Sequence, residues 1–96
     1  MKILALDIGG TAVKYGVFGG DSTFGQFSVA DDDGRERLPE KIIACVAQNE
    51  TECIGISTPG PFDFETGTGL MTHKLKSLYR ISLKEMIERQ FPKRKL

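Results

Sequence analysis

The sequence predicts a mixed α/β domain in which an antiparallel meander of three strands precedes a crossover helix and a parallel fourth strand. Apolar residues recur at strand spacing over 3–29, at helical spacing over 38–49, and as a short run over 53–57. The chain has 96 residues, enough for one domain with a modest core. The last predicted element is a helix that ends before Pro92. An α/β domain does not usually stop after a helix without a further strand, so we expect this domain to be incomplete.

The first predicted strand is apolar and leads into a glycine turn. Residues 3–8 are apolar apart from Asp7, which is typical of a central strand with both faces covered. Gly9 and Gly10 follow, and glycine lets the backbone turn N–H groups toward an anion, while Thr11 adds a hydroxyl donor. A polyphosphate with Mg²⁺ held by Asp7, directly or through water, is the ligand that this combination favours.

The next elements follow from spacing and turn residues. A hairpin loop at 19–21 separates the second strand, over 12–18, from a third strand. Apolar residues at helical spacing, with Pro39 in the first turn, predict a helix over 38–49. Because a crossover helix precedes it, the strand over 53–57 is expected to run parallel to the first strand.

Turn residues follow the fourth predicted strand and lead to the last helix. Residues 58–68 are rich in Pro, Gly, Asp and Thr, and loops at strand ends carry ligands in open α/β sheets. Ser82 and Glu85 form a capping-box pattern that starts the helix. Residues 93–95 are expected to be a solvated connection. The outer edge of the fourth strand is then unpaired, which favours a homo-oligomer or a strand-exchanged association.

The composition excludes several classes of partner. Acidic and basic residues balance at thirteen each, so no net field favours nucleic acid or an anionic membrane. Cys45 and Cys53 are too few for a Cys-rich metal module, and no signal peptide is evident, so free thiols in the cytoplasm are expected. No apolar run reaches the roughly 20 residues of a membrane span. His73, the single histidine, is expected at the surface.

The two ligand-like motifs also have purely structural interpretations. Asp7 followed by glycines is typical of a tight β-hairpin with a capped turn. Residues 55–63 are typical of a rigid connection in which two prolines fix φ, Gly60 permits the bend and Asp63 bonds neighbouring backbone. Neither GxxxxGK[ST] nor GxGxxG occurs, so a hairpin is expected to wrap the phosphates. Together the two motifs indicate a ligand site more specifically than either motif does alone, because both follow strands that should lie side by side.

These residues resemble the ROK family of sugar kinases and sugar-responsive repressors, within the actin-like ATPase superfamily. The run DIGGTAVK at 7–14 is similar to the family's first phosphate motif, and GISTPGPFDFETG at 55–67 is similar to the stretch leading toward the sugar cleft. The resemblance covers essentially the whole chain. It implies that residues 1–96 are the N-terminal portion of a ribonuclease H-like, actin-like ATPase lobe, with no second domain present.

The resemblance also implies a role for each matching residue. It places Asp7 near Mg²⁺, which it would contact through water. The residues expected at the β- and γ-phosphates of ATP are Gly9, Gly10, Thr11 and Lys14. The residues expected in the wall of the sugar cleft are Pro59 and Gly60.

The activity implied by the resemblance is ATP- and Mg²⁺-dependent transfer of the γ-phosphoryl group to a hydroxyl of a hexose. The family's catalytic base, second phosphate motif, adenosine-binding segment and zinc motif all lie downstream, so the chain alone is expected to be inactive. A non-catalytic truncated fragment and a sugar-responsive regulator lacking its DNA-binding domain are the alternatives. A ribonuclease H-like nuclease is disfavoured because the fourth strand ends in Ser57 and Thr58, without a further carboxylate.

Overall fold

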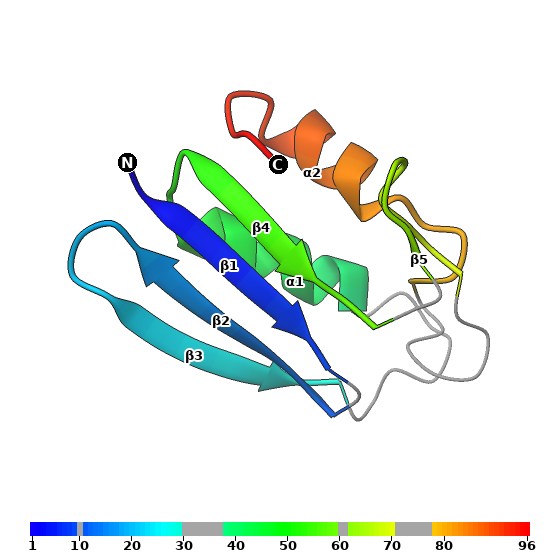
Figure 1. Cartoon of the computed structure of the whole chain (residues 1–96), viewed down its shortest axis with the longest axis horizontal. Coiled ribbons are helices and arrows are strands. Elements are labelled where there is room, and N and C mark those ends of the chain that lie inside the picture. Colours follow the sequence, from blue (N-terminus) through cyan, green and yellow to red (C-terminus); the bar gives the residue numbers. More distant parts are fainter. Residues whose placement is uncertain (10, 30–37, 60–61, 71–77) are drawn as a thin grey trace.

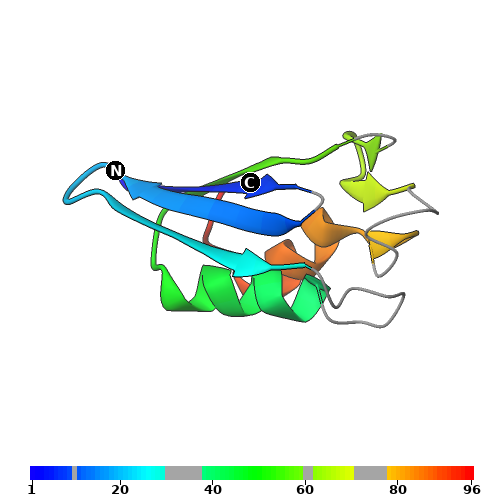
Figure 2. The ribbon, with the colours of Figure 1, turned by 90° about the horizontal axis from the view of Figure 1, so that it is seen from below.

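The protein folds into a sheet layer and a helix layer. The computed structural model describes residues 1–9, 11–29, 38–59, 62–70 and 78–96. Figure 1 shows the strands face-on, and Figure 2 shows the helices together on one side of the sheet. The mixed α/β architecture predicted from the sequence is confirmed.

A four-stranded mixed sheet has the order β3-β2-β1-β4. Its strands are β1 (Ile3–Ile8), β2 (Ala12–Phe18), β3 (Thr23–Ser28) and β4 (Cys53–Ser57). The pairs β1–β2 and β2–β3 are antiparallel, whereas β1–β4 is parallel. The predicted meander and parallel fourth strand are therefore confirmed.

Helix α1 (Leu38–Gln48) makes the crossover between β3 and β4. Pro39 lies in its first turn, where a missing N–H costs no helical hydrogen bond. At the other end, the guanidinium of Arg94 donates to the carbonyls of Val46 (2.6 Å) and Asn49 (3.2 Å). Because α1 has no basic residue in its own last turn, Arg94 supplies the positive charge and donors that helix C-termini favour.

The loop predicted after β4 contains a short hairpin. Strands β5 (Phe62–Asp63) and β6 (Thr68–Gly69) pair antiparallel. The Asp63 carboxylate accepts hydrogen bonds from the backbone N–H groups of Glu65 (3.0 Å) and Thr66 (3.2 Å), as the structural interpretation of this residue expected. The turn is thus held by its own side chain.

Helix α2 (Leu83–Gln90) begins at the predicted cap. The Ser82 hydroxyl accepts from the N–H of Glu85 (3.1 Å) and donates to the carbonyl of Thr66 (2.6 Å), so one side chain caps α2 and ties it to the β5–β6 hairpin. The Glu85 carboxylate pairs with Arg89, one turn further along the helix. Neither helix, within the described ranges, is long and apolar enough to cross a membrane.

The core lies between the helices and one face of the sheet. Side chains alternate along each strand, so every second residue faces the helices. The sheet contributes Leu4, Leu6, Ile8, Val13 and Ile54 to this core, and the helices contribute Leu38, Ile42, Val46, Leu83 and Ile87. On the opposite face Ile3 is 41% exposed and Phe24 is 71% exposed. The expectation that β1 is covered on both faces is therefore not met within the described residues.

The C-terminal segment returns to the sheet. The N–H of Ile54 donates to the carbonyl of Lys95 (2.7 Å), and the N–H of Lys95 donates to the carbonyl of Glu52 (2.8 Å). These bonds form a parallel bridge between Cys53 and Lys95. The predicted unpaired edge is thus corrected at this point, because β4 is paired where it begins. Lys93 and Lys95 are exposed, as predicted for a solvated connection.

Candidate functional site

The turn between β1 and β2 is held by close backbone contacts. The N–H of Gly9 donates to the carbonyl of Ala12 at 2.9 Å. A Cβ added to Gly9 would lie 3.0 Å from that carbonyl oxygen, so a larger residue would crowd the turn. Within the described residues, the glycines with positive φ are Gly19 and Gly67, so Gly9 does not have a left-handed backbone. Glycine is favoured at position 9 because the Ala12 carbonyl oxygen lies so close to it. Gly10 lies outside the described residues.

Thr11 lies at the tip of this turn with its side chain exposed. Its carbonyl accepts a hydrogen bond from the N–H of Val29 at 3.0 Å, immediately after β3. The turn is therefore fixed from two sides, by Ala12 on β2 and by the end of β3.

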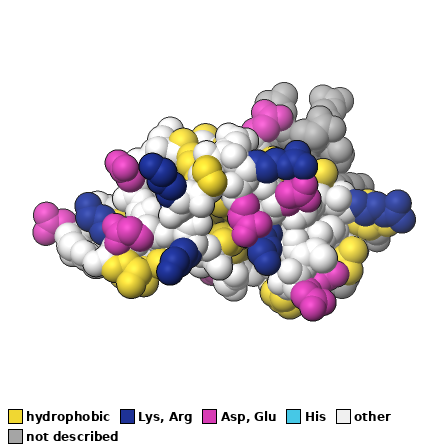
Figure 3. Space-filling model, turned by 90° about the horizontal axis from the view of Figure 1, so that it is seen from above, with side chains coloured by type: hydrophobic (Ala, Val, Ile, Leu, Met, Phe, Trp, Pro, Cys, Tyr) yellow, Lys and Arg dark blue, Asp and Glu magenta, His cyan; other side chains and the backbone are white. Residues whose placement is uncertain are grey.

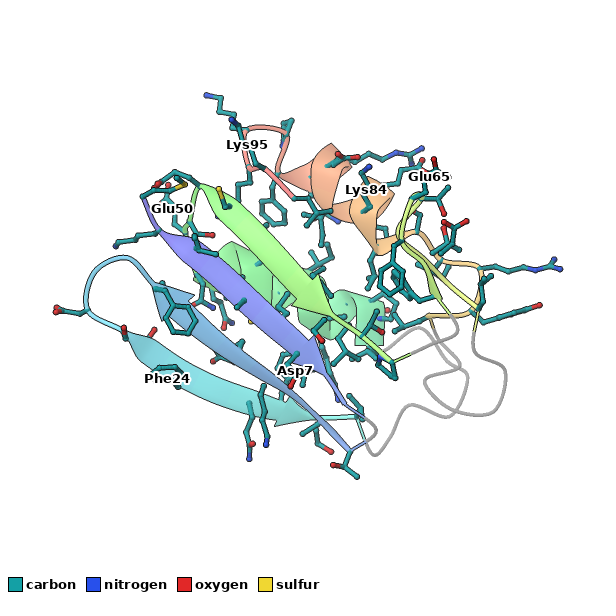
Figure 4. All side chains as sticks on the ribbon, in the orientation of Figure 1. Asp7, Phe24, Glu50, Glu65, Lys84 and Lys95 are labelled. Atoms are coloured by element: carbon teal, nitrogen blue, oxygen red, sulfur yellow. The ribbon has the colours of Figure 1, made fainter. Side chains whose placement is uncertain are left out.

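A row of polar side chains crosses the open face of the sheet beside this turn. Asp7 is in register with Lys14 on β2 and with Ser57 on β4, and Lys14 is in register with Gln26 on β3. Residues in register share one face, so these four side chains form what we call the polar row. All four are exposed. Figure 4 shows Asp7 near the end of β1 that leads to the turn.

The polar row joins predicted and missed residues. The sequence pattern identified Asp7 and Lys14, and the sheet places them opposite each other on neighbouring strands. It did not identify Ser57 or Gln26 as site residues. Counting the parallel register from β1 to β4 would have aligned Ser57 with Asp7, because both are the fifth residue of the paired ladder.

A shallow hollow of about 410 Å³ lies next to the polar row on the same face. Its floor is made of small residues, and a Cβ added to Gly55 would meet no atom within 4 Å. Phe18 and Phe24 border it, with their rings in edge-to-face contact at 5.6 Å between centroids. Figure 4 shows Phe24 on β3, away from Asp7, so the hollow has a polar and an aromatic end.

The second predicted motif begins at the same edge of the sheet. Pro59 follows β4 by two residues and is half-buried. The hydroxyl of Thr58 lies 3.4 Å from the Pro59 carbonyl oxygen as a donor. The ends of β1 and β4 are adjacent, so Asp7 and the start of the Pro-Gly-Pro turn are neighbours in the fold. Gly60 and Pro61 lie outside the described residues, as does His73.

Electrostatics away from the polar row are mixed. On the side of the molecule shown in Figure 3, acidic and basic side chains are interspersed with hydrophobic ones. Burial raises the pKa of the Cys45 thiol on α1, and a hydrogen bond from Asn49 opposes that effect. Cys45 faces the core, so it does not belong to the polar row. Both cysteines are free thiols, as predicted.

Comparison with known proteins identifies the class to which this arrangement corresponds. No protein-family model matches the chain. The chain is 34% identical over 91 residues to the beta-glucoside kinase of Klebsiella pneumoniae and 32% identical over 91 residues to that of Listeria monocytogenes. Each match covers 92% of this chain and 31% of the relative, so the chain spans about a third of the length of these relatives. The relatives that the chain resembles are thus sugar kinases.

Solved structures make the class more specific. The ROK hexokinase of Thermus thermophilus matches with a TM-score of 0.73 and 26% sequence identity, over 100% of this chain and 34% of that chain. The mixed sheet with its helices therefore has the actin-like ATPase fold of these kinases, of which the chain covers about a third. The resemblance to ROK family sugar kinases, inferred from the two motifs, is confirmed over nearly the whole chain.

Proposed function

We propose that this chain is part of an ATP-dependent sugar kinase and that its polar row and β1–β2 turn receive Mg²⁺ and the phosphates of the nucleotide. One observation supports this most: Asp7 and Lys14 lie side by side at the end of the glycine turn, on an open sheet face. This occurs in a chain whose likeness to two beta-glucoside kinases covers 92% of its length.

The chemistry of the polar row fits Mg²⁺ and phosphate. Mg²⁺ prefers oxygen ligands and keeps several of its waters, which suits the exposed carboxylate of Asp7. The bound ion would neutralise charge on the phosphates and bridge their oxygens. In this proposal Asp7 holds the hydrated ion, and the hydroxyl of Ser57 orders a water beside it.

The cationic and neutral donors would act on the phosphates themselves. Lys14 carries an exposed ammonium on the strand next to Asp7, where it can balance phosphate charge. Backbone N–H groups of Gly10 and Thr11, with the Thr11 hydroxyl, would donate to phosphate oxygens from the turn. Phosphoryl transfer depends mainly on such positioning and charge stabilisation, so these groups contribute without forming covalent bonds.

The remaining functions belong to other parts of the proposed kinase. We propose that residues 1–96 form the N-terminal portion of one lobe, that Pro59 and Gly60 line the approach of a hexose or a β-glucoside, and that the hydroxyl proton is accepted by a carboxylate outside these residues. The 96-residue chain by itself is then expected to transfer no phosphoryl group.

Phosphorylation of a sugar panel tests this proposal. The product of the complete reading frame is incubated with Mg²⁺ and ATP together with glucose, other hexoses or β-glucosides, and sugar phosphates are measured by mass spectrometry. The proposal expects a sugar phosphate that requires both ATP and Mg²⁺. A folded protein that phosphorylates none of these sugars would overturn it.

A further inference from the structure

Strand β3 forms the outer edge of the sheet on the side opposite β4 (Figure 1). The N–H of Val29, just after β3, donates to the carbonyl of Thr11 and so points toward β2. Along an antiparallel strand, the backbone groups of successive residues point alternately to one neighbour and to the other side. The N–H and carbonyl groups of Phe24 and Gln26 therefore point away from β2. Within the described residues, no strand or bridge pairs with β3 on that outer side.

The open part of this edge is short and symmetric. Ser28 has the next outward carbonyl, and that carbonyl already accepts a hydrogen bond from the Lys41 ammonium on α1 at 3.0 Å. At the other end, β3 begins at Thr23, directly after the β2–β3 loop. The part that remains for pairing is therefore 24–26, with Gly25 at its centre.

Strand β3 lacks the features that usually protect an edge strand. It contains no charged residue and no proline, the residues with which proteins commonly block edge-to-edge pairing. Phe24 is 71% exposed on the open face, and Figure 4 shows it on β3. A hollow of about 360 Å³, lined by Lys14, Tyr15 and residues 24–26, lies at this edge. An extended strand laid against β3 would occupy this hollow.

Tyr15 supports the centre of the edge from the opposite face. It is in register with Gly25, and a Cβ added to Gly25 would overlap the Tyr15 hydroxyl. The Tyr15 ring therefore covers Gly25 and brings its hydroxyl to the middle of the open edge. An aromatic ring over an edge glycine helps to fix the register of that strand.

We propose that two copies of the chain pair through this edge, with their β3 strands antiparallel and a two-fold axis at Gly25. Phe24 of each copy then lies opposite Gln26 of the other. The N–H of Phe24 donates to the carbonyl of the facing Gln26, and the N–H of that Gln26 donates to the carbonyl of Phe24. All the outward backbone groups of residues 24 and 26 are paired in this arrangement, and the two sheets become continuous.

The symmetry of the edge favours a second copy over a strand of another sequence. A two-fold axis brings identical residues together, which an uncharged strand tolerates and a charged strand does not. The Phe24 rings of the two copies become diagonal neighbours on one face, about 7–8 Å apart between Cα atoms and within reach of aromatic contact. On the other face the Tyr15 hydroxyls meet at the axis, where each can donate or accept a hydrogen bond. Moving the axis by one residue toward Ser28 would require its carbonyl, which Lys41 already uses.

Sedimentation velocity of the product of the complete reading frame, over a wide range of concentrations, tests the proposal. Phe24→Lys removes the ring and places like charges across the axis, whereas Gln26→Pro removes an outward N–H and leaves the hydrogen bonds to β2 intact. Phe64→Lys is the matched control, since Phe64 is 73% exposed but follows β5. Circular dichroism establishes that each variant is folded. We expect a wild-type dimer whose dissociation constant rises by about tenfold or more in both β3 variants and stays unchanged in the control.

Amide hydrogen exchange in the wild-type protein tests the pairing without any variant. The N–H groups of Phe24 and Gln26 should exchange more slowly as the concentration rises and the dimer forms, whereas that of Gly25, which points toward β2, should not change. A wild-type protein that stays monomeric at every concentration would overturn the proposal, as would a dimer that neither β3 variant weakens. Protection of both amides in the monomer would also overturn it, by assigning the edge to another segment. None of these readouts involves catalysis, so their failure is distinct from failure of the proposed kinase activity.

Discussion

The two faces of the sheet differ sharply although they are made by the same strands. Leu6 is 2% exposed and packs in the core, whereas its neighbour Asp7 is exposed in the polar row. The same alternation separates Val13 from Lys14 on β2. A strand repeats every two residues, so one short sequence can stabilise the fold with one set of side chains and present chemistry with the other. Stability and activity should therefore respond to different substitutions along β1.

The largest stability effect is expected from Leu6→Ala on the covered face. Removing a buried leucine side chain costs about 2–5 kcal/mol, a large part of the roughly 5–15 kcal/mol that stabilises a typical domain. Urea unfolding followed by circular dichroism measures the loss. Ala5→Ser, one residue earlier on the open face, is the control and should change stability by less than about 0.5 kcal/mol. Similar losses for both variants would show that the faces are not distinct.

A smaller loss is expected from Ser82→Ala, which removes the cap of the helix that carries Leu83 and Ile87 to the covered face. The expected cost is about 1 kcal/mol, because the N–H of Glu85 loses its acceptor. Ser57→Ala makes the same change in the polar row and should have little effect on the free energy of unfolding. Thermal unfolding of both variants provides the comparison, and a larger loss for Ser57→Ala would contradict it.

A gain in stability is expected from Gly55→Ala on the open face. The added Cβ meets no atom within 4 Å, and alanine lowers the entropy of the unfolded chain, so stabilisation of about 0.5–1 kcal/mol is expected. Gly69→Ala should act in the opposite direction, because its Cβ would lie 2.5 Å from the backbone carbonyl oxygen of Leu78. Chemical denaturation distinguishes the signs. Destabilisation by Gly55→Ala would indicate that the open face is covered in solution.

The smallest effect is expected from the ionisation of Cys45 in the core. Burial raises the pKa of this thiol above its ordinary value of 9.0, so the folded state favours the protonated form. The associated stability is fully present below pH 9.0 and is lost as the pH rises through the raised pKa.

Iodoacetamide labelling followed by mass spectrometry should modify half-buried Cys53 before Cys45. Faster labelling of Cys45 in the folded chain would contradict this.

Local patterns were enough to predict the elements and their order. Short turns and apolar alternation defined the meander, and the helical spacing that begins at Leu38 defined the crossover. The same patterns could not show that β1 has one open face, because Ile3 and Ala5 are apolar whether or not another segment covers them. The pairing of Lys95 was also missed. It uses backbone groups, which leave no side-chain pattern in a basic segment.

The candidate site was predicted in part for a related reason. Asp7 and Lys14 belong to one hairpin, so their proximity follows from local sequence. Ser57 reaches the polar row from β4, after a crossover, and its position depends on a register that no turn specifies. The proximity of Asp7 and Lys14, which are close in sequence, was therefore easier to predict than the position of Ser57, which depends on the pairing of β1 with β4.

The most direct test of the account is Asp7→Asn, measured for both activity and stability in the product of the complete reading frame. We expect kcat/KM for sugar phosphorylation to fall by about 100-fold or more, since the carboxylate proposed to hold Mg²⁺ beside the phosphates is lost. The free energy of unfolding should stay within about 0.5 kcal/mol of the wild type. Asp21→Asn, an exposed aspartate in the β2–β3 loop, is the matched control and should leave both quantities unchanged. Near-normal turnover by Asp7→Asn would contradict the assignment of the polar row to the nucleotide phosphates.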